Sequence, residues 1–359
     1  MDDNVSHTVR LTQMMLGEGY RIRARGVLED LATYDAYRQS EQTEEPVLPT
    51  FTVNTALKLL DIPLLPGDTV TQNPLRVAMN AEGEGWRGAV LYRSPDDEQT
   101  WNAVLTVQQG AVCGAVVELP EAQVNYAFQD NRSEIIVNLL ADGTLASTPQ
   151  SALLNGANAA LVGDEILQFA TAELIGENQY KLTGLLRGML GTEWAMDSHQ
   201  IGERFVLLNE NTPKDANSAS LIGLPRQYRA VSIGQTLGQV MSETFTHSGI
   251  GLKPYAPVHI MGERDSSGNL VISWVRRSRT ETSWRDLVDA PLNEDSEVYE
   301  IDVMDGADVV RTLTSIVPNA NYTAIQQIAD FGATQSSITL RIYQLSAAIG
   351  RGFKAEVTL

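Results

Sequence analysis

Short runs of alternating apolar and polar residues, each ended by a turn, recur along the chain and limit what it can fold into. The runs Leu75–Met79, Gly85–Ser94 and Thr100–Val107 follow one another with short connections, and Ser133–Leu140 continues them. Alternation places every second side chain on one face, as a half-buried strand requires. Antiparallel pairing is the simplest arrangement for strands joined so closely. We therefore expect a mainly β protein with several antiparallel β-sandwich or barrel domains.

Only one short helix is expected. Ser147 or Thr148 can cap its start, Pro149 suits its first turn, and Gly156 follows its end. Near the N-terminus, alternating runs on either side of the turn Gly17–Gly19 predict a β-hairpin.

Two segments divide the chain. The acidic run Gln39–Glu45, followed by Pro46 and Pro49, is the first predicted linker, so residues 1–48 form an N-terminal part with its linker. Residues 49–246 hold the central β domain or domains. Residues 247–257 are rich in Gly and Pro and form the second predicted linker. Residues 258–359 contain about seven strand-like runs, the number expected of an immunoglobulin-like sandwich.

The start of this last part at Leu270–Trp274, and its end in Gly-Arg-Gly before a strand, resemble a fibronectin type III module. We therefore expect a C-terminal sandwich of fibronectin type III type.

Composition excludes several functions. The chain has 359 residues and a formal net charge of −19, and so acidic a surface disfavours specific binding to nucleic acid, which depends on Lys and Arg. No apolar run approaches the roughly 20 residues that span a bilayer. The acidic, polar N-terminus is the opposite of a signal peptide. Cys113, the single cysteine, lies in an apolar run and is expected to be buried.

No catalytic, cofactor or metal motif is present. GxxxxGK[ST], GxSxG, HExxH and CxxC do not occur, and the four histidines are far apart in sequence. We expect a protein that is not an enzyme and binds no cofactor. A hydrolytic pair of carboxylates stays open, because 45 acidic residues offer many pairs and none stands out. His199 is expected to be a structural turn residue.

One cluster suggests a binding surface. Arg276, Arg277 and Arg279 form the one tight basic group, close to Trp274 and Trp284. Such a group suits a sugar or an acidic partner, and a charged strand edge explains it equally well. Trp284 lies in a polar stretch and is the best candidate for an exposed tryptophan, whereas Trp101 is the second possible sugar platform.

A longer motif carries a resemblance to a known family. Leu185–Gly188, Gly191–Trp194, His199 and Gly202–Leu208 read LLRG-x-x-GTEW, a histidine, and GERFVLL. This spaced pattern is similar to the C-terminal region of the large tail-tip, or host-specificity, protein of gene transfer agents and related long-tailed bacteriophages. Residues 1–48 resemble the closing strands of a preceding hub-type domain. Members are usually far longer, so the chain is expected to be a split gene product or a C-terminal piece.

The resemblance implies a structural component of the tail tip or baseplate, which connects the end of the tail tube to host-recognition parts. It implies a homotrimer at the distal end of the virion tail, made in the bacterial host cytoplasm. The expected partners are the hub, distal tail and fibre proteins, with a host glycan or receptor also possible. The alternative is a tail adhesin that binds or hydrolyses carbohydrate. Oligomeric state together with glycan binding separates the two.

Overall fold

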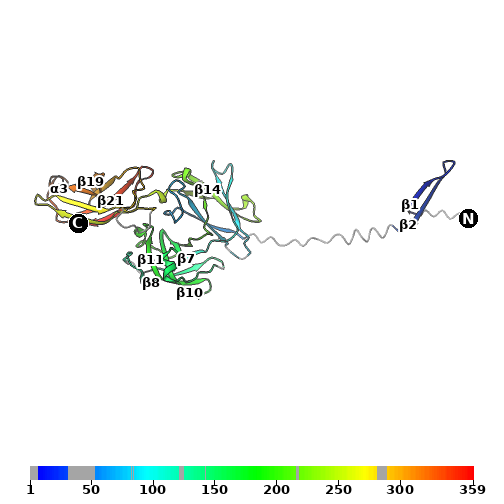
Figure 1. Cartoon of the computed structure of the whole chain (residues 1–359), viewed down its shortest axis with the longest axis horizontal. Coiled ribbons are helices and arrows are strands. Elements are labelled where there is room, and N and C mark those ends of the chain that lie inside the picture. The colour runs from blue at the N-terminus through cyan, green and yellow to red at the C-terminus, as the bar shows by residue number, and fades with distance from the viewer. Residues whose placement is uncertain are drawn as a thin grey trace. The chain divides into compact units, whose positions relative to one another are not determined.

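The computed structural model describes residues 7–30, 53–81, 83, 85–120, 125–141, 143–215, 218–280 and 289–359. The chain forms two compact units, Met1–Phe51 and Thr52–Leu359. Most described elements are antiparallel strands, which Figure 1 draws as arrows, so the expected mainly β fold is confirmed. No helix among the described residues is both long and apolar enough to cross a membrane.

The first unit is the predicted hairpin of β1 (Val9–Leu16) and β2 (Ile22–Leu28). Cross-strand pairs in one register collect apolar side chains on one face. This apolar hairpin face consists of Val9, Leu11, Met14, Leu16, Ile22, Ala24, Gly26 and Leu28. The opposite face carries Arg10, Arg23 and Arg25. Every residue of both strands is exposed, so this hairpin has no core of its own.

Two sheets begin the second unit. One has the order β13-β4-β3 and the other the order β15-β14-β5-β6. Their bounds are β3 Thr55–Leu60, β4 Leu75–Ala81, β5 Ala89–Ser94, β6 Asn102–Val107, β13 Lys214–Asp215, β14 Pro225–Ser232 and β15 Glu243–Thr246. Their apolar faces share a core that includes Val77, Leu91 and Tyr228. Because β14 pairs with β5, residues between β6 and β13 form an insertion.

The insertion is a closed six-stranded barrel in the order β10-β11-β8-β7-β12-β9. Its strands are β7 Cys113–Glu118, β8 Asp130–Leu139, β9 Ala159–Val162, β10 Glu165–Gly176, β11 Gln179–Met189 and β12 Arg204–Leu207. Figure 1 labels four of them in the green part of the chain. Phe169, Leu182 and Val137 are fully buried in its core. The expected short helix is α2 (Gln150–Leu154), and Pro149 stands at its N-cap in place of Ser147 or Thr148.

The last part of the chain is a sandwich of two sheets. The first has the order β16-β17-β20, and the second runs β19-β18-β21 with β22 and β23 both paired to β21. The bounds are β16 Val258–Arg264, β17 Leu270–Val275, β18 Tyr299–Asp305, β19 Asp308–Ser315, β20 Asn319–Tyr322, β21 Thr339–Ser346, β22 Gly350–Arg351 and β23 Ala355–Thr358. Trp274 packs edge-on against Tyr299, with 5.0 Å between ring centroids. The expected fibronectin type III-like sandwich is confirmed.

A second α-helix corrects the expectation of one. The sequence suggested a strand over Tyr322–Ile328, but β20 ends at Tyr322 and α3 (Ala324–Phe331) follows. The Thr323 hydroxyl accepts the backbone N–H of Gln326, and the Gln326 side chain accepts the N–H of Thr323. This capping box satisfies N–H groups that the first turn leaves unpaired. Short 3-10 turns complete the described elements: η1 Glu193–Ala195, η2 Ser218–Leu221, η3 Leu237–Gln239 and η4 Ile250–Leu252.

Residues 247–257, expected to be a solvated linker, are packed. His247 is only 2% exposed, and Leu252 and Tyr255 are buried. The Asp61 carboxylate accepts the backbone N–H groups of Ser248, Gly249 and Ile250, at 2.6, 3.0 and 2.9 Å. His247 therefore lies in the predicted linker but is a buried residue.

Candidate functional site

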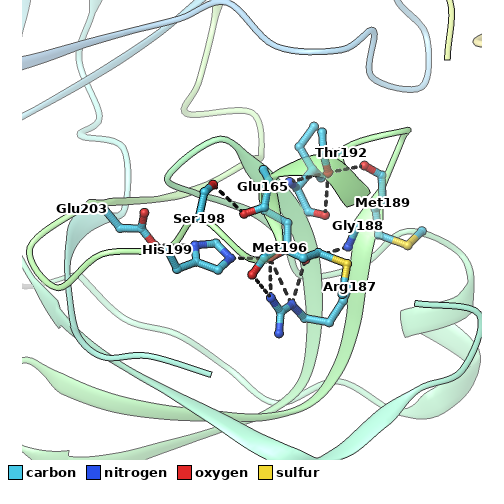
Figure 2. Close-up of polar contacts among 11 residues, drawn as sticks. Glu165, Arg187, Gly188, Met189, Thr192, Met196, Ser198, His199 and Glu203 are labelled. Atoms are coloured by element: carbon cyan, nitrogen blue, oxygen red, sulfur yellow. Dashed lines mark hydrogen bonds and ion pairs between the residues drawn. The ribbon is translucent and has the colours of Figure 1, made fainter. Parts of the chain in front are cut away.

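The motif Leu185–Trp194 closes β11 and turns at the end of the barrel. Arg187, near the end of β11, lies beside Glu165 at the start of β10, and both side chains are almost completely buried. The Arg187 Nε donates to Glu165 Oε1 at 2.8 Å, and Nη2 donates to Oε2 at 2.8 Å (Figure 2). This fork geometry satisfies a buried carboxylate with two parallel bonds.

The same carboxylate binds two further groups. The Gly188 backbone N–H donates to Glu165 Oε1 at 2.6 Å, and His199 Nε2 lies 2.7 Å from Oε2. The other His199 ring nitrogen, Nδ1, lies 2.6 Å from Glu203 Oε1. We call Glu165, Arg187, His199 and Glu203 the charge cluster. Figure 2 shows His199 lying between the two glutamates.

The electrostatics favour an ionised Glu165 and a protonated His199. Burial alone raises the pKa of Glu165, but hydrogen bonds from His199 and Arg187, with the Arg187 charge, bring it below its ordinary value. Burial alone lowers the pKa of His199, but bonds and charges from Glu165 and Glu203 raise it overall. His199 therefore tends to carry a proton and to join two carboxylates as an imidazolium.

The turn after Arg187 has a backbone that suits glycine. Gly188 and Gly191 have φ of 60° and 80°, a region that side chains with a Cβ rarely adopt. Tyr255 lies against Gly191, where an added Cβ would come 2.5 Å from the tyrosine Cδ1. The Thr192 hydroxyl donates to the Met189 carbonyl at 2.7 Å and accepts the Ile166 N–H at 2.9 Å. These bonds tie the turn to β10.

The turn carries residues that contact the sandwich. The Glu193 carboxylate pairs with Arg277, which lies just after β17. The Trp194 ring stacks on Phe353, with centroids 5.5 Å apart and planes 19° apart. Tyr255, against Gly191, also has Arg277 over its ring at 5.4 Å. We call Gly191, Glu193 and Trp194, with Tyr255, Arg277 and Phe353, the joint.

The groups of the charge cluster are buried and bonded to one another. Glu165 is completely buried, so it cannot meet a glycosidic bond, and both ring nitrogens of His199 are hydrogen-bonded. In the hydrolytic arrangement, two carboxylates face a space large enough for the sugar and a water. Here an imidazole occupies the space between Glu165 and Glu203. Within the described ranges, no group of three or more His, Cys, Asp and Glu residues is placed to hold a metal ion.

The three arginines predicted as a binding surface do not form a free basic patch. Arg276 pairs with Asp289 and lies 3.7 Å from Glu297, and Arg277 pairs with Glu193. The third, Arg279, is 4% exposed and pairs with Glu294. Each guanidinium is thus engaged by a carboxylate of its own chain, which the spacing in the sequence did not reveal.

The structure describes one of the two tryptophans considered as sugar platforms. Trp284 lies outside the described residues. Trp101 is covered on one side by the Arg229 guanidinium, whose Cζ is 4.4 Å from the ring centroid. Trp194, which belongs to the motif, is 45% exposed.

Sequence reasoning also missed Glu165 as the partner of Arg187. The available signal was an acidic residue directly before the apolar pair Ile166 and Leu167 at the start of β10, since a buried charge needs a partner.

Comparison with known proteins gives one family match. Residues 111–206, which cover the barrel and the charge cluster, match the family described as "Rcc01698-like, C-terminal". This family is associated with gene transfer agents of Rhodobacter, so the match is consistent with a protein related to gene transfer agents. No curated protein matches the chain.

Two solved structures are similar to parts of the chain. The crystal structure of domains d3-d4 of the rat CD45 extracellular region has 12% identity and a TM-score of 0.23, over 37% of this chain and 62% of that one. The crystal structure of the FN1-FN3 domains of chicken CNTN1 has 9% identity and a TM-score of 0.21, over 86% of this chain and 98% of that one. The fold assignment therefore depends on the strand order described above.

Proposed function

We propose that the protein is a structural component of the tail tip or baseplate of a gene transfer agent or a related long-tailed bacteriophage. In this role it connects the end of the tail tube to host-recognition parts. The observation that carries the proposal is the structural role of the motif residues. These residues form a buried charge cluster and a joint between barrel and sandwich. The family match over residues 111–206 supports the same class.

A rigid joint suits a part that transmits force or position. The buried Glu165 carboxylate joins β10, β11 and the turn, because it accepts hydrogen bonds from Arg187 and Gly188 and contacts His199. Loss of a charged partner would leave the buried charges poorly compensated. This turn then holds Trp194 and Glu193 against the sandwich.

The hairpin supports assembly with other subunits. A two-stranded hairpin is at best marginally stable alone in water. Its apolar face is exposed throughout, with Leu11 at 58%, Met14 at 66% and Leu16 at 72%. We propose that hairpins of three copies meet through this face in a homotrimer. Residues 9–28 contain four arginines and one glutamate, a net +3 in a chain of −19, so the hairpin is also the part least repelled by the acidic body of another copy.

The experiment is deletion of the gene in a cell that produces the particles, with the full chain supplied again from a plasmid. We expect particles from the deletion strain to lack the distal tip and to fail to attach to recipient cells, and the plasmid to restore both. As a control, capsid and tail-tube proteins are measured in the same particles. Complete, infectious tails in the deletion strain would contradict the proposal.

A further inference from the structure

A groove of about 370 Å³ lies beside the joint. One wall is the turn residue Trp194 with Tyr126, from the loop between β7 and β8. The other wall is the sandwich, at the start of β16 and at β23. Neither strand is flanked on this side by a further strand among the described residues, since β16 pairs with β17 and β23 with β21. The groove is therefore built from parts of the chain that are far apart in sequence.

Trp194 forms a fixed aromatic platform in this groove. One side of the indole is stacked on Phe353, at 5.5 Å between centroids, yet the side chain is still 45% exposed. The stack and the charge cluster behind it hold the ring in place before any ligand arrives. A ring that is already ordered loses little entropy when it is covered. Tyr126, 49% exposed, provides a second aromatic surface with a hydroxyl.

His259 projects from a strained position on the opposite wall. It lies in β16 with φ of 51°, where the pairing of β16 with β17 is irregular between Val258 and Met261. Bulges of this kind re-aim a side chain, and strained backbone of this kind gathers at functional sites. The imidazole is exposed and belongs to the groove lining.

The charges of the groove cancel in pairs. Arg277 is paired with Glu193, and Lys354 Nζ lies 2.9 Å from Glu356 Oε2. An uncharged ligand suits such a lining, and the −19 net charge of the chain repels an acidic polymer. A saccharide ring has an apolar face that stacks on an aromatic ring, and hydroxyls that bond to polar side chains.

We propose that the groove between Trp194, Tyr126 and His259 binds neutral saccharides. This goes beyond the structural role. If the protein assembles into the tip with an intact joint but has no affinity for sugars, the groove proposal is wrong and the tail-tip proposal still stands.

The test is titration of the full chain with three neutral tetrasaccharides, namely cellotetraose, maltotetraose and N-acetylchitotetraose. Binding is followed by tryptophan fluorescence and by saturation transfer to the sugar protons. We expect at least one to bind with a dissociation constant of about 1 mM, as suits a small open site. Trp194→Ala should weaken that binding at least tenfold.

Variants away from the joint keep the test informative if Trp194→Ala loosens the fold. His259→Ala and Tyr126→Ala affect neither the Phe353 stack nor the charge cluster, so the melting temperature should not change. Each should weaken binding about threefold. Because a tenfold change in dissociation constant corresponds to about 1.4 kcal/mol, this is a loss of under 1 kcal/mol of binding free energy. Trp101→Ala is the matched control, and its binding should stay at the wild-type level. Absence of binding by all three sugars at 10-fold the expected dissociation constant would overturn the proposal. Binding by the Trp194, His259 and Tyr126 variants that equals wild-type binding would also overturn it. So would tighter binding of tetragalacturonate, an acidic sugar, than of the neutral sugars.

Discussion

Glu165 is the residue on which the motif depends most. Glu165→Gln keeps the shape of the side chain and removes its charge, so Arg187 and His199 lose their shared counter-ion inside the barrel. We expect the free energy of unfolding to fall by about 3–5 kcal/mol, as when one partner of a buried ion pair is removed. Urea unfolding followed by tryptophan fluorescence measures it.

Glu173→Gln is the matched control for this change. Glu173 lies on the same strand, β10, but its side chain is 59% exposed and pairs with Lys181 at the surface. We expect a change within about 0.5 kcal/mol. Equal losses of unfolding free energy in the two variants would show that the buried charge cluster stabilises the fold no more than a surface ion pair does.

The histidine of the charge cluster makes stability depend on pH. The pKa of His199 is raised above its ordinary 6.5 in the folded protein, so the folded state binds the proton more tightly than the unfolded state. This contribution is complete below about pH 6.5 and is lost as the pH rises through the raised value. His247, paired with Asp61, also has a raised pKa and acts in the same direction.

We therefore expect the free energy of unfolding to decline from pH 6 towards pH 9. His199→Gln should remove part of the decline and leave the part due to His247. Unfolding curves at several pH values check this. An unaltered decline in His199→Gln would mean that the residue does not titrate in the charge cluster.

At the scale of elements, the turn after β11 offers a controlled test of close packing. Gly191 and Gly202 both have positive φ, 80° and 87°, but only Gly191 lies against another residue, Tyr255. Gly191→Val and Gly202→Val should both cost about 1–2 kcal/mol through the left-handed backbone. Gly191→Val should cost about 1–3 kcal/mol more, because the added atoms overpack the joint. Equal melting temperatures of the two variants would show that contact with Tyr255 adds nothing to the cost of the Gly191 substitution.

Strands were predictable because their signal is local. The alternation in Thr339–Ser346 marks a strand with one buried face without knowledge of its partner. The run Leu75–Met79 also marks a strand, but β4 is buried on both faces. The helix α3 was missed although Thr323 and Gln326 spell a capping box, because the neighbouring Tyr322 and Ala324 extended the alternating pattern. The pairing of β5 with β14, across the whole barrel insertion, has no local signal. The same holds for the site, since Glu165 and Arg187 meet only through the register of the barrel.

At the scale of the whole molecule, the hairpin should control assembly. Leu11→Asp combined with Met14→Asp places two charges on the apolar hairpin face, so we expect a trimer to become a monomer. The melting temperature of the Thr52–Leu359 unit should not change, because the hairpin is a separate compact unit. Mass measurement by light scattering checks the assembly.

Gln13→Asp is the control, since Gln13 lies on the polar face opposite Arg25. It should leave the trimer intact. A monomeric wild-type chain, or a trimer that survives the double substitution, would rule out the hairpin as the contact between copies.

Position in the particle tests the central claim most directly. A gold label attached at Leu359, in particles whose own copy of the protein carries the attachment sequence, can be located by electron microscopy. The account predicts label at the distal end of the tail only, with three copies in a threefold-averaged reconstruction of the tip. Label on the capsid, along the tail tube or in free protein alone would contradict it, and so would six copies at the tip.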